Sequence, residues 1–314
     1  MSFLKLIRFK NLIIIAALQY LLRYILLLPI LFSYELLPAL THFQFAVVVL
    51  STVMLAASGY IINDYFDIRT DRINKPKKVI VGIKYERRKV LMWHVVFTLV
   101  GLFLGLSIAY AFRKESYVLM YLAIPVLLWI YSTTFKRQML IGNLLISFLT
   151  ALVAYLVVSV EFSALIVEYG NQITSSEACS AAWFWTSGFA FFAFVATLGR
   201  EIIKDIEDKE GDKAIKCSTL PIELGVVNTK VIVLLVNGLS LCMLWFFFFW
   251  IPQLRQDKST LLYFVFLLTI PYILLSIQII RAKTKSHFHL ASQFSKVIML
   301  FGILFVFVIR QFFI

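Results

Sequence analysis

The sequence predicts an all-α, polytopic membrane protein. Hydrophobic residues make up 61% of the 314-residue chain and charged residues only 15%, whereas soluble domains average about 45–50% apolar and about 25% charged residues. The three cysteines, Cys179, Cys217 and Cys242, are odd in number and far apart, which supports neither a disulfide framework nor a zinc site. A soluble enzyme, a disordered chain and a disulfide-rich scaffold are therefore excluded.

Nine stretches reach the roughly 20 apolar residues that a membrane-spanning helix needs. We interpret the first stretch as a retained helix, because no small-residue cleavage site follows it and eight further spans do. We expect residues 1–314 to form a single transmembrane domain, a helical bundle around a central cavity. The predicted spans are Leu12–Phe32, His42–Ile62, Leu91–Phe112, Tyr117–Phe135, Ile141–Val160, Ala182–Leu198, Val231–Ile251, Leu261–Ile280 and Val297–Ile314.

The distribution of basic residues predicts the orientation of these spans. Of the 30 lysines and arginines, 24 fall before the first span or in the even-numbered loops, five fall on the opposite side, and Arg23 lies within the first span. Because basic residues are retained on the cytoplasmic side, we expect the N-terminus inside and the C-terminus outside. The net charge of +13 is then explained by topology and anionic lipid headgroups rather than by nucleic acid. The outer segment Glu161–Ala181, which carries three glutamates and no basic residue, is predicted to be a solvated connector.

Acidic residues cluster where the second span meets the cytoplasm. Asp64, Asp67 and Asp71 are spaced i, i+3 and i+7, which places them within one narrow arc of a helix. Asn63 is four residues before Asp67 and borders the same arc. This spacing predicts an acidic face at the cytoplasmic boundary of the membrane.

The end of the sixth span repeats the pattern with Asp205, Asp208 and Asp212. One alternative is that both clusters are solvated helix ends, but two matched clusters on the same predicted side, beside basic loops, favour a shared site. Converging carboxylates repel one another unless cations lie between them, and Mg²⁺ is usually held by one or two carboxylates together with substrate phosphates. The seven residues of the two clusters are therefore candidate Mg²⁺ ligands.

Basic residues on the same side are candidates for binding a diphosphate. Lys136 and Arg137 end the fourth span, where Arg can bind phosphate oxygens in a bidentate manner and Lys as a point charge. Arg200 and Lys204 precede the second cluster and are candidates for binding an acceptor phosphate or for pairing with the acidic residues. Arg23, within the first span, must face a cavity or a partner, and both a substrate-binding and a structural role stay open.

Taken together, these motifs resemble the UbiA superfamily of intramembrane prenyltransferases. Asn63-Asp64-x-x-Asp67-x-x-x-Asp71 and Asp205-x-x-Asp208-x-x-x-Asp212 resemble its two aspartate-rich motifs, and the segment 131–137 resembles its tyrosine-to-lysine/arginine element. The chain is most similar to the digeranylgeranylglyceryl phosphate synthases within that superfamily, on the segment 200–212 and on Ser218-Thr219-Leu220-Pro221. An Asn74-Lys75-Pro76 turn is also similar.

The resemblance implies a Mg²⁺-dependent transfer of a prenyl group from a prenyl diphosphate, such as geranylgeranyl diphosphate, to the hydroxyl of a lipid acceptor such as geranylgeranylglyceryl phosphate. It implies catalytic roles for Asp67, Asp208, Lys136 and Arg137, a site open to the cytoplasm of a bacterial or archaeal membrane, contact with membrane lipids, and no obligate protein partner.

The sequence departs from the superfamily pattern in two places, and the second departure concerns the acceptor rather than the metal chemistry. The first helix begins Arg8-Phe9-Lys10-Asn11 without the usual proline, and Lys77-Lys78-Val79 stands where Asp-Arg-Pro is common. An aromatic acceptor, as in quinone, tocopherol or haem side-chain attachment, is the alternative within the enzyme class. A transporter that uses the carboxylates as an ion path is the alternative outside it, disfavoured because the acidic residues gather at one face and only Arg23 is expected deep in the membrane.

Overall fold

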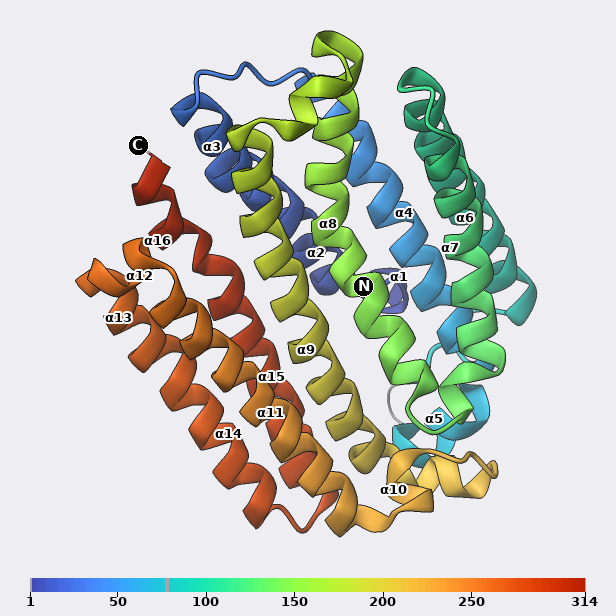
Figure 1. Ribbon diagram of the computed structural model, residues 1–314. Coiled ribbons are helices and arrows are strands. Elements are labelled where there is room, and N and C mark those ends of the chain that lie inside the picture. The colour runs from blue at the N-terminus through green and yellow to red at the C-terminus, as the bar shows by residue number, and fades with distance from the viewer. Residues whose placement is uncertain (1, 77–78, 314) are drawn as a thin grey trace.

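The computed structural model describes residues 2–76 and 79–313, and these are helical almost throughout (Figure 1). Lys77, Lys78 and Ile314, which belong to the predicted motif and to the last predicted span, lie outside the described residues. Within the described part of the chain, nine helices are long and apolar enough to cross a membrane, which confirms the predicted fold class. They cover Phe9–Ser33, His42–Phe66, Arg87–Ala111, Glu115–Arg137, Ile141–Tyr169, Glu177–Ala214, Gly225–Trp250, Lys258–Arg281 and Lys285–Phe313.

The first five spans and the helices between them form the N-terminal half of the bundle. Helix α4 packs against α6 and α7, and α2 packs against α4 and α8. The elements are α1 (Ser2–Leu6), α2 (Phe9–Leu21), the π-helical segment η1 (Leu22–Leu27), α3 (Leu28–Ser33), α4 (His42–Phe66), α5 (Ile68–Asn74), α6 (Arg87–Ala111), α7 (Glu115–Thr133), the 3₁₀ turn η3 (Phe135–Arg137) and α8 (Ile141–Tyr169).

The last four spans form the C-terminal half. Helix α9 contacts α8 on one side and α11 and α15 on the other, so it joins the two halves (Figure 1). The elements are η4 (Asn171–Ser175), α9 (Glu177–Ala214), α10 (Leu220–Glu223), α11 (Gly225–Trp250), α12 (Pro252–Gln256), α13 (Lys258–Tyr263), the π-helical segment η5 (Phe264–Thr269), α14 (Ile270–Arg281), α15 (Lys285–Leu304), α16 (Val306–Arg310) and η6 (Gln311–Phe313).

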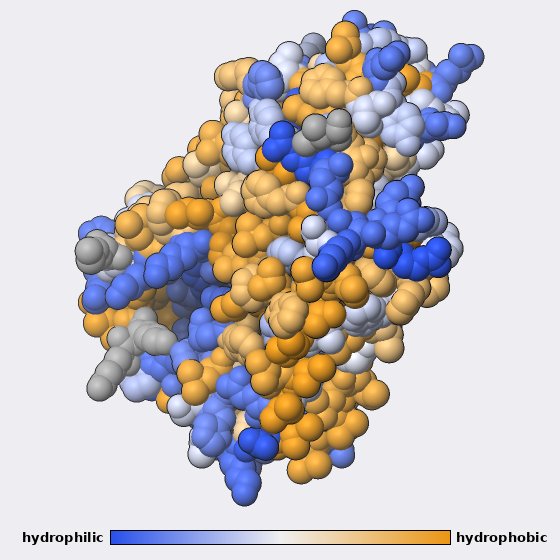
Figure 2. All heavy atoms as spheres, turned by 90° about the vertical axis from the view of Figure 1, so that its left-hand side faces the viewer, coloured by the Kyte–Doolittle hydropathy of each residue, from blue (hydrophilic) through white to orange (hydrophobic). Residues whose placement is uncertain are grey.

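The surface is dominated by apolar side chains. Figure 2 shows hydrophobic residues over much of one face, with hydrophilic residues in patches at its margins. Large exposed side chains such as Phe43, Phe103, Leu119 and Leu235 are more than 60% exposed. Helices suit this environment because they satisfy all their backbone hydrogen bonds internally, where lipid offers none.

Two π-helical segments interrupt the spans, and each lies just before a proline. Segment η1 precedes Pro29 and η5 precedes Pro271. A proline lacks the backbone N–H and its ring crowds the carbonyl four residues earlier, and a local change of helix pitch accommodates both effects. The first of these segments carries Arg23.

Several helices extend well beyond their predicted spans. The sixth span was predicted to end at Leu198, but α9 has 38 residues and continues to Ala214. It therefore holds the whole second aspartate cluster as one continuous helix. Hydropathy alone misses this extension because the last turns of α9 are charged, and a helix outside the hydrocarbon does not need apolar residues.

The prediction of a solvated connector at Glu161–Ala181 was wrong. Helix α8 continues through Glu161 to Tyr169, and the Glu161 side chain is fully buried. It forms a 2.9 Å ion pair with Arg23 and accepts backbone hydrogen bonds from Ala39 and Leu40 at 2.9 and 3.1 Å. The expectation that only Arg23 lies deep was wrong for the same reason, because a buried arginine requires a buried counter-charge.

This ion pair lies at the opposite end of the bundle from the aspartates. Arg23 also donates to the carbonyl of Leu40, which lies just before the first residue of α4, whereas Asp64 lies near the last. With a rise of about 1.5 Å per residue, the 24 residues between Leu40 and Asp64 separate the two sites by more than 30 Å. The structure therefore places Arg23 in a structural pair rather than beside the other candidate residues.

Removing one partner of this pair should destabilise the protein. We expect Glu161→Gln to lower the free energy of unfolding by about 3 kcal/mol, because it leaves the Arg23 charge buried without a counter-charge. Unfolding in mixed detergent micelles measures the effect. Glu168→Gln, at an exposed position on the same helix, is the matched control and should behave like the wild type. Equal stability of the two variants would contradict the assignment.

Candidate active site

Asn74, the last residue of α5, links the segment of the first aspartate cluster to that of the second. Its side-chain amide donates to the carbonyl of Asp208 at 2.8 Å and accepts from the backbone N–H of Gly211 at 3.0 Å. Both partners belong to the segment of α9 that carries the second cluster. Gly211 is required for this close approach, because a Cβ at this position would lie 2.3 Å from the Asn74 side-chain nitrogen.

Two aspartates of the first cluster, Asp64 and Asp67, each pair with a basic side chain. Asp64 pairs with Arg8 at 2.9 Å. Asp67 accepts a hydrogen bond from Asn63 at 2.7 Å and forms a close ion pair with Lys136. Lys136 lies at the end of the fourth span, and its predicted role is to bind a diphosphate. In this structure it instead offsets the negative charge of Asp67.

The second cluster has partners from other helices. Lys75 pairs with Asp208 at 2.7 Å, and Asn143 at the start of α8 donates to Asp205 at 2.8 Å. The other carboxylate oxygen of Asp208, Oδ1, is buried and has no hydrogen-bond partner among the described residues. An uncompensated buried carboxylate oxygen is costly, and this one is a ready ligand for a cation.

Charges of the two clusters interact with one another. Asp212 lies close enough to Asp67 of the first cluster for repulsion, and it also lies within range of the charges on Lys136 and Lys75. Burial, together with the neighbouring Asp67, raises the pKa of Asp71 to about 6. The basic side chains present therefore do not fully offset the negative charge that the clusters bring together.

The donor atoms fit a Mg²⁺ ion that is shared with a phosphate ligand. Within residues 2–76 and 79–313, no group of three or more His, Cys, Asp or Glu side chains is arranged to hold a metal by itself. Mg²⁺ in phosphate-transfer sites is usually held by only one or two carboxylates plus phosphate oxygens, so an all-protein cage is not needed. The unpartnered oxygen of Asp208 and the oxygen-only donor set match that requirement.

The remaining candidate residues lie at the margins of the site. Arg137 is exposed, and its carbonyl accepts from the backbone of Ser218 at 2.8 Å. Arg200 and Lys204 both bind Glu201, each at 2.7 Å. They pair with a carboxylate outside the two clusters rather than with the aspartates.

Sequence reasoning missed several residues that position the site. Asn74 and Lys75 belong to the Asn-Lys-Pro turn noted in the sequence. Their contacts with α9 could be recognised only once the fold was known. Asn143 had no sequence signal. Tyr131, which belongs to the segment 131–137 singled out from the sequence, lies within range of the charges on Lys136, Asp67 and Asp205.

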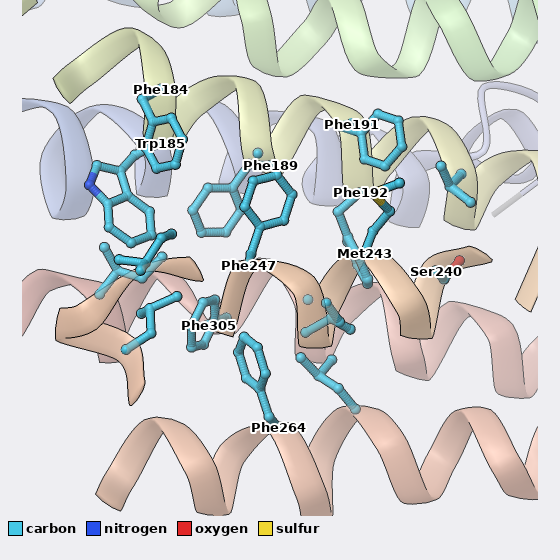
Figure 3. A pocket seen from close by; sticks show the side chains of 18 residues that line it. Phe184, Trp185, Phe189, Phe191, Phe192, Ser240, Met243, Phe247, Phe264 and Phe305 are labelled. Carbon is cyan, nitrogen blue, oxygen red and sulfur yellow. The ribbon is translucent and has the colours of Figure 1, made fainter. Parts of the chain in front are cut away.

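An apolar cavity lies on a different part of α9. Its volume is about 100 Å³, and Figure 3 shows its wall of aromatic rings. Val195 is its lining residue on α9 nearest to the aspartates, ten residues before Asp205 and hence about 15 Å along the helix axis. The aromatic side chains around this cavity include Phe184, Trp185, Phe189, Phe192, Phe247, Phe264 and Phe305. The lining residues on α9 are therefore too far away to contact a diphosphate held by the aspartates.

The fold and the site together define a class: a polytopic membrane protein in which acidic residues from two helix ends, with interleaved basic residues, form a polar site at one membrane boundary. Residues 21–306 match the UbiA prenyltransferase family. The chain therefore belongs to this family and is a prenyltransferase, which overturns the transporter alternative.

Curated relatives agree with this assignment. A digeranylgeranylglyceryl phosphate synthase from Methanosphaera stadtmanae is 33% identical over 230 residues, which cover 73% of this chain and 70% of that protein. Other proteins of the same name match over 52% to 63% of their own length.

Solved structures share the fold. One, from work on digeranylgeranylglyceryl phosphate synthase in membranes, superposes with a TM-score of 0.60 at 22% identity, covering 98% of this chain and 96% of the other. A UbiA homologue from Archaeoglobus fulgidus, bound to DMAPP and Mg²⁺, superposes with a TM-score of 0.54 at 15% identity, covering 98% and 100%.

The contact between Asn74 and Gly211 provides a test of how the two clusters are held together. Gly211→Ala should displace the Asn74 side chain and cost about 1–3 kcal/mol of stability through overpacking, with a loss of prenyl transfer. Thermal unfolding and turnover in detergent measure both effects. Gly188→Ala on the same helix is the control, because a Cβ there meets no atom within 4 Å.

The double variant Asn74→Ala/Gly211→Ala removes the clash and should recover stability relative to Gly211→Ala while activity stays low. Full activity of Gly211→Ala would show that the contact does not organise the site.

Proposed function

We propose that this protein transfers a prenyl group from a prenyl diphosphate to a hydroxyl of a prenylated glycerol phosphate, with Mg²⁺ bound between the two aspartate clusters. The observation that carries the proposal is the convergence of both clusters, with Lys136 and Lys75 between them, at one boundary of an apolar bundle. Such a site suits a substrate with an anionic head and a hydrocarbon tail. The names of the synthases that match the chain support the acceptor class.

The basic side chains would exchange partners when the substrate binds. Lys136 now pairs with Asp67, and Lys75 pairs with Asp208. A Mg²⁺ ion bound by the carboxylates would supply positive charge that stabilises the departing diphosphate. Lys136 and Lys75 would then turn to the diphosphate oxygens, and Arg137 at the exposed rim would bind the part nearest to water.

The reaction breaks the bond between the allylic carbon and the diphosphate oxygen, and the diphosphate leaves with the electron pair. The acceptor hydroxyl then bonds to that carbon, and its proton passes to the departed diphosphate. The ring of Tyr131, which lies within range of Lys136, Asp67 and Asp205, would stabilise the electron-poor allylic carbon. The Asn143 amide would keep Asp205 oriented through the cycle.

The orientation of the chain is part of the proposal. We infer that the aspartate end faces the cytoplasm, because 24 of the 30 basic residues belong to that side and basic residues are retained there. The N-terminal Arg8 contacts Asp64 at this end, and Gln311 near the C-terminus contacts Asp257 at the other.

Substitution of one aspartate from each cluster tests the metal site. We expect Asp67→Asn and Asp208→Asn each to lower turnover at least about 100-fold, since each removes charge that stabilises the transition state. Formation of labelled lipid product from a radiolabelled prenyl diphosphate measures the loss. Glu210→Gln, exposed on the same helix α9, is the matched control.

Chelation should abolish turnover of the wild type, and added Mg²⁺ should restore it. Turnover that persists in both variants, or that survives chelation, would refute the role of the clusters.

A panel of acceptors tests the acceptor class. We expect product with a prenylglycerol phosphate and none with phenolic acids or naphthoates, because the basic residues near the site favour a phosphate. Mass spectrometry of the lipid product identifies it. Product only with aromatic acceptors would refute the glycerol phosphate assignment and leave the prenyl transfer intact.

A further inference from the structure

The first turns of α15 contact the segments that carry the two aspartate clusters. Lys285, the first residue of α15, donates to the backbone carbonyl of Asn74 at 2.8 Å and to its side-chain oxygen Oδ1 at 3.1 Å. One turn later, His289 contacts Glu207 of α9, with 2.9 Å between Nδ1 and a carboxylate oxygen. Because residues four apart lie on the same side of a helix, one face of α15 contacts both α5 and α9.

These contacts close a ring of three segments. Lys285 of α15 binds Asn74. Asn74 in turn binds the backbone of α9 at Asp208 and Gly211. Helix α9 returns to α15 through Glu207, a buried residue directly before Asp208. The second aspartate cluster is therefore tied to the last span as well as to α5.

Lys285 helps to fix the orientation of the Asn74 amide. In the structure, Oδ1 accepts from two donors, the backbone N–H of Gly211 at 3.0 Å and the ammonium of Lys285 at 3.1 Å. If the amide were turned over, its NH₂ group would face both of these donors, and its oxygen would face the carbonyl of Asp208. Asn74 is buried, where unpaired polar groups are costly. Only one orientation is therefore favourable.

Lys285 also binds the C-terminal end of α5. The last carbonyls of a helix have no partner within the helix, and a cation near them is favourable. The carbonyl of Asn74 is one of these, and Lys285 supplies its hydrogen bond. The next residue, Lys75, forms the 2.7 Å ion pair with Asp208. A fixed end of α5 therefore keeps the Lys75 ammonium at the Asp208 carboxylate.

The start of α15 is anchored by contacts other than those of Lys285. Lys230 of α11 donates to the carbonyls of Ile280 and Ala282 at 3.2 and 2.5 Å, and Phe288 of α15 is buried. Lys285 itself lies at an exposed position, so loss of its side chain leaves no cavity in the core. Its removal should therefore leave α15 in place.

We propose that Lys285 is a positioning residue for the aspartate site, and that it acts through Asn74 to fix the Asp208 carboxylate relative to the first cluster. This inference rests on the proposed function, because it assumes that Mg²⁺ binds between the clusters. Lys285 binds neither the metal nor the substrate in this proposal. It differs in this respect from Lys75 and Lys136, which would turn to the diphosphate.

The first test measures the Mg²⁺ dependence of turnover for Lys285→Met in the full-length protein in detergent micelles. We expect the Mg²⁺ concentration for half-maximal turnover to rise about tenfold, as for one lost charge-assisted hydrogen bond. The KM for the prenyl diphosphate at saturating Mg²⁺ should stay within about twofold of the wild type. Lys285→Arg, which keeps the charge and the donors, should recover most of the Mg²⁺ affinity. Lys283→Met, which removes an exposed charge just before the same helix, is the matched control and should resemble the wild type.

A double-mutant cycle tests whether Lys285 acts through Asn74. Asn74→Ala removes the side chain that carries the effect, so the addition of Lys285→Met should raise the Mg²⁺ requirement by no more than about twofold further. Asn74→Asp keeps the acceptor oxygen, and in that background Lys285→Met should have at least its full effect. Asn74→Ser takes the place of Asn74→Ala if the latter does not fold.

Hydrogen exchange gives a readout that needs neither Mg²⁺ nor substrate. The backbone amides of residues 68–74 should exchange faster in Lys285→Met than in the wild type, because the end of α5 loses a partner and opens more often. Lys283→Met should exchange like the wild type.

Three results would overturn the proposal: an unchanged Mg²⁺ requirement in Lys285→Met, even with lowered stability; unchanged exchange of α5; or an equally large effect of Lys285→Met in the Asn74→Ala background, which would indicate direct contact with the substrate. Failure of the proposed function has a different signature. The wild type itself would then give no product, while the exchange of α5 would still respond to Lys285→Met.

Discussion

Repulsion among the aspartates of the two clusters is the main constraint on the structure around the site. The carboxylates come from segments that are far apart in the sequence, yet they meet at one boundary of an apolar bundle. Arg8, Lys75 and Lys136 come from three separate segments and each pairs with one of these acids. The contact of Asn74 with the backbone of α9 keeps the acidic faces together. The N-terminal turn, the residue after α5 and the start of α8 each supply a group that binds one of these acids.

Much of this arrangement was predictable from the sequence. Asp64, Asp67 and Asp71 have the same spacing as Asp205, Asp208 and Asp212. The second set lies on the single helix α9, whereas the first runs from the end of α4 into α5, with Asp67 at the junction. Hydropathy identifies spans because lipid requires long apolar helices. The resemblance of the motifs to the UbiA superfamily was confirmed by the family match over residues 21–306.

The residues that escaped prediction are those whose role depends on a partner distant in the sequence. Asn143 is an ordinary polar residue at a helix start until the fold places it 2.8 Å from Asp205. Glu161 resembles a residue of a solvated loop, and only the packing of α8 against the first span reveals its ion pair with Arg23. The composition of a segment indicates whether it suits lipid or water, whereas the pairing of its charges depends on which helices pack beside it.

The length of α9 has a consequence for the direction of the reaction. Its 38 residues extend for about 57 Å, nearly twice the roughly 30 Å hydrocarbon thickness of a bilayer, and the aspartates lie on the part toward its C-terminal end. A prenyl diphosphate cleaved there yields one fragment soluble in water and one soluble only in lipid. The two products would leave into different phases. Because the reverse reaction needs both products at the site together, their separation between water and lipid would oppose it.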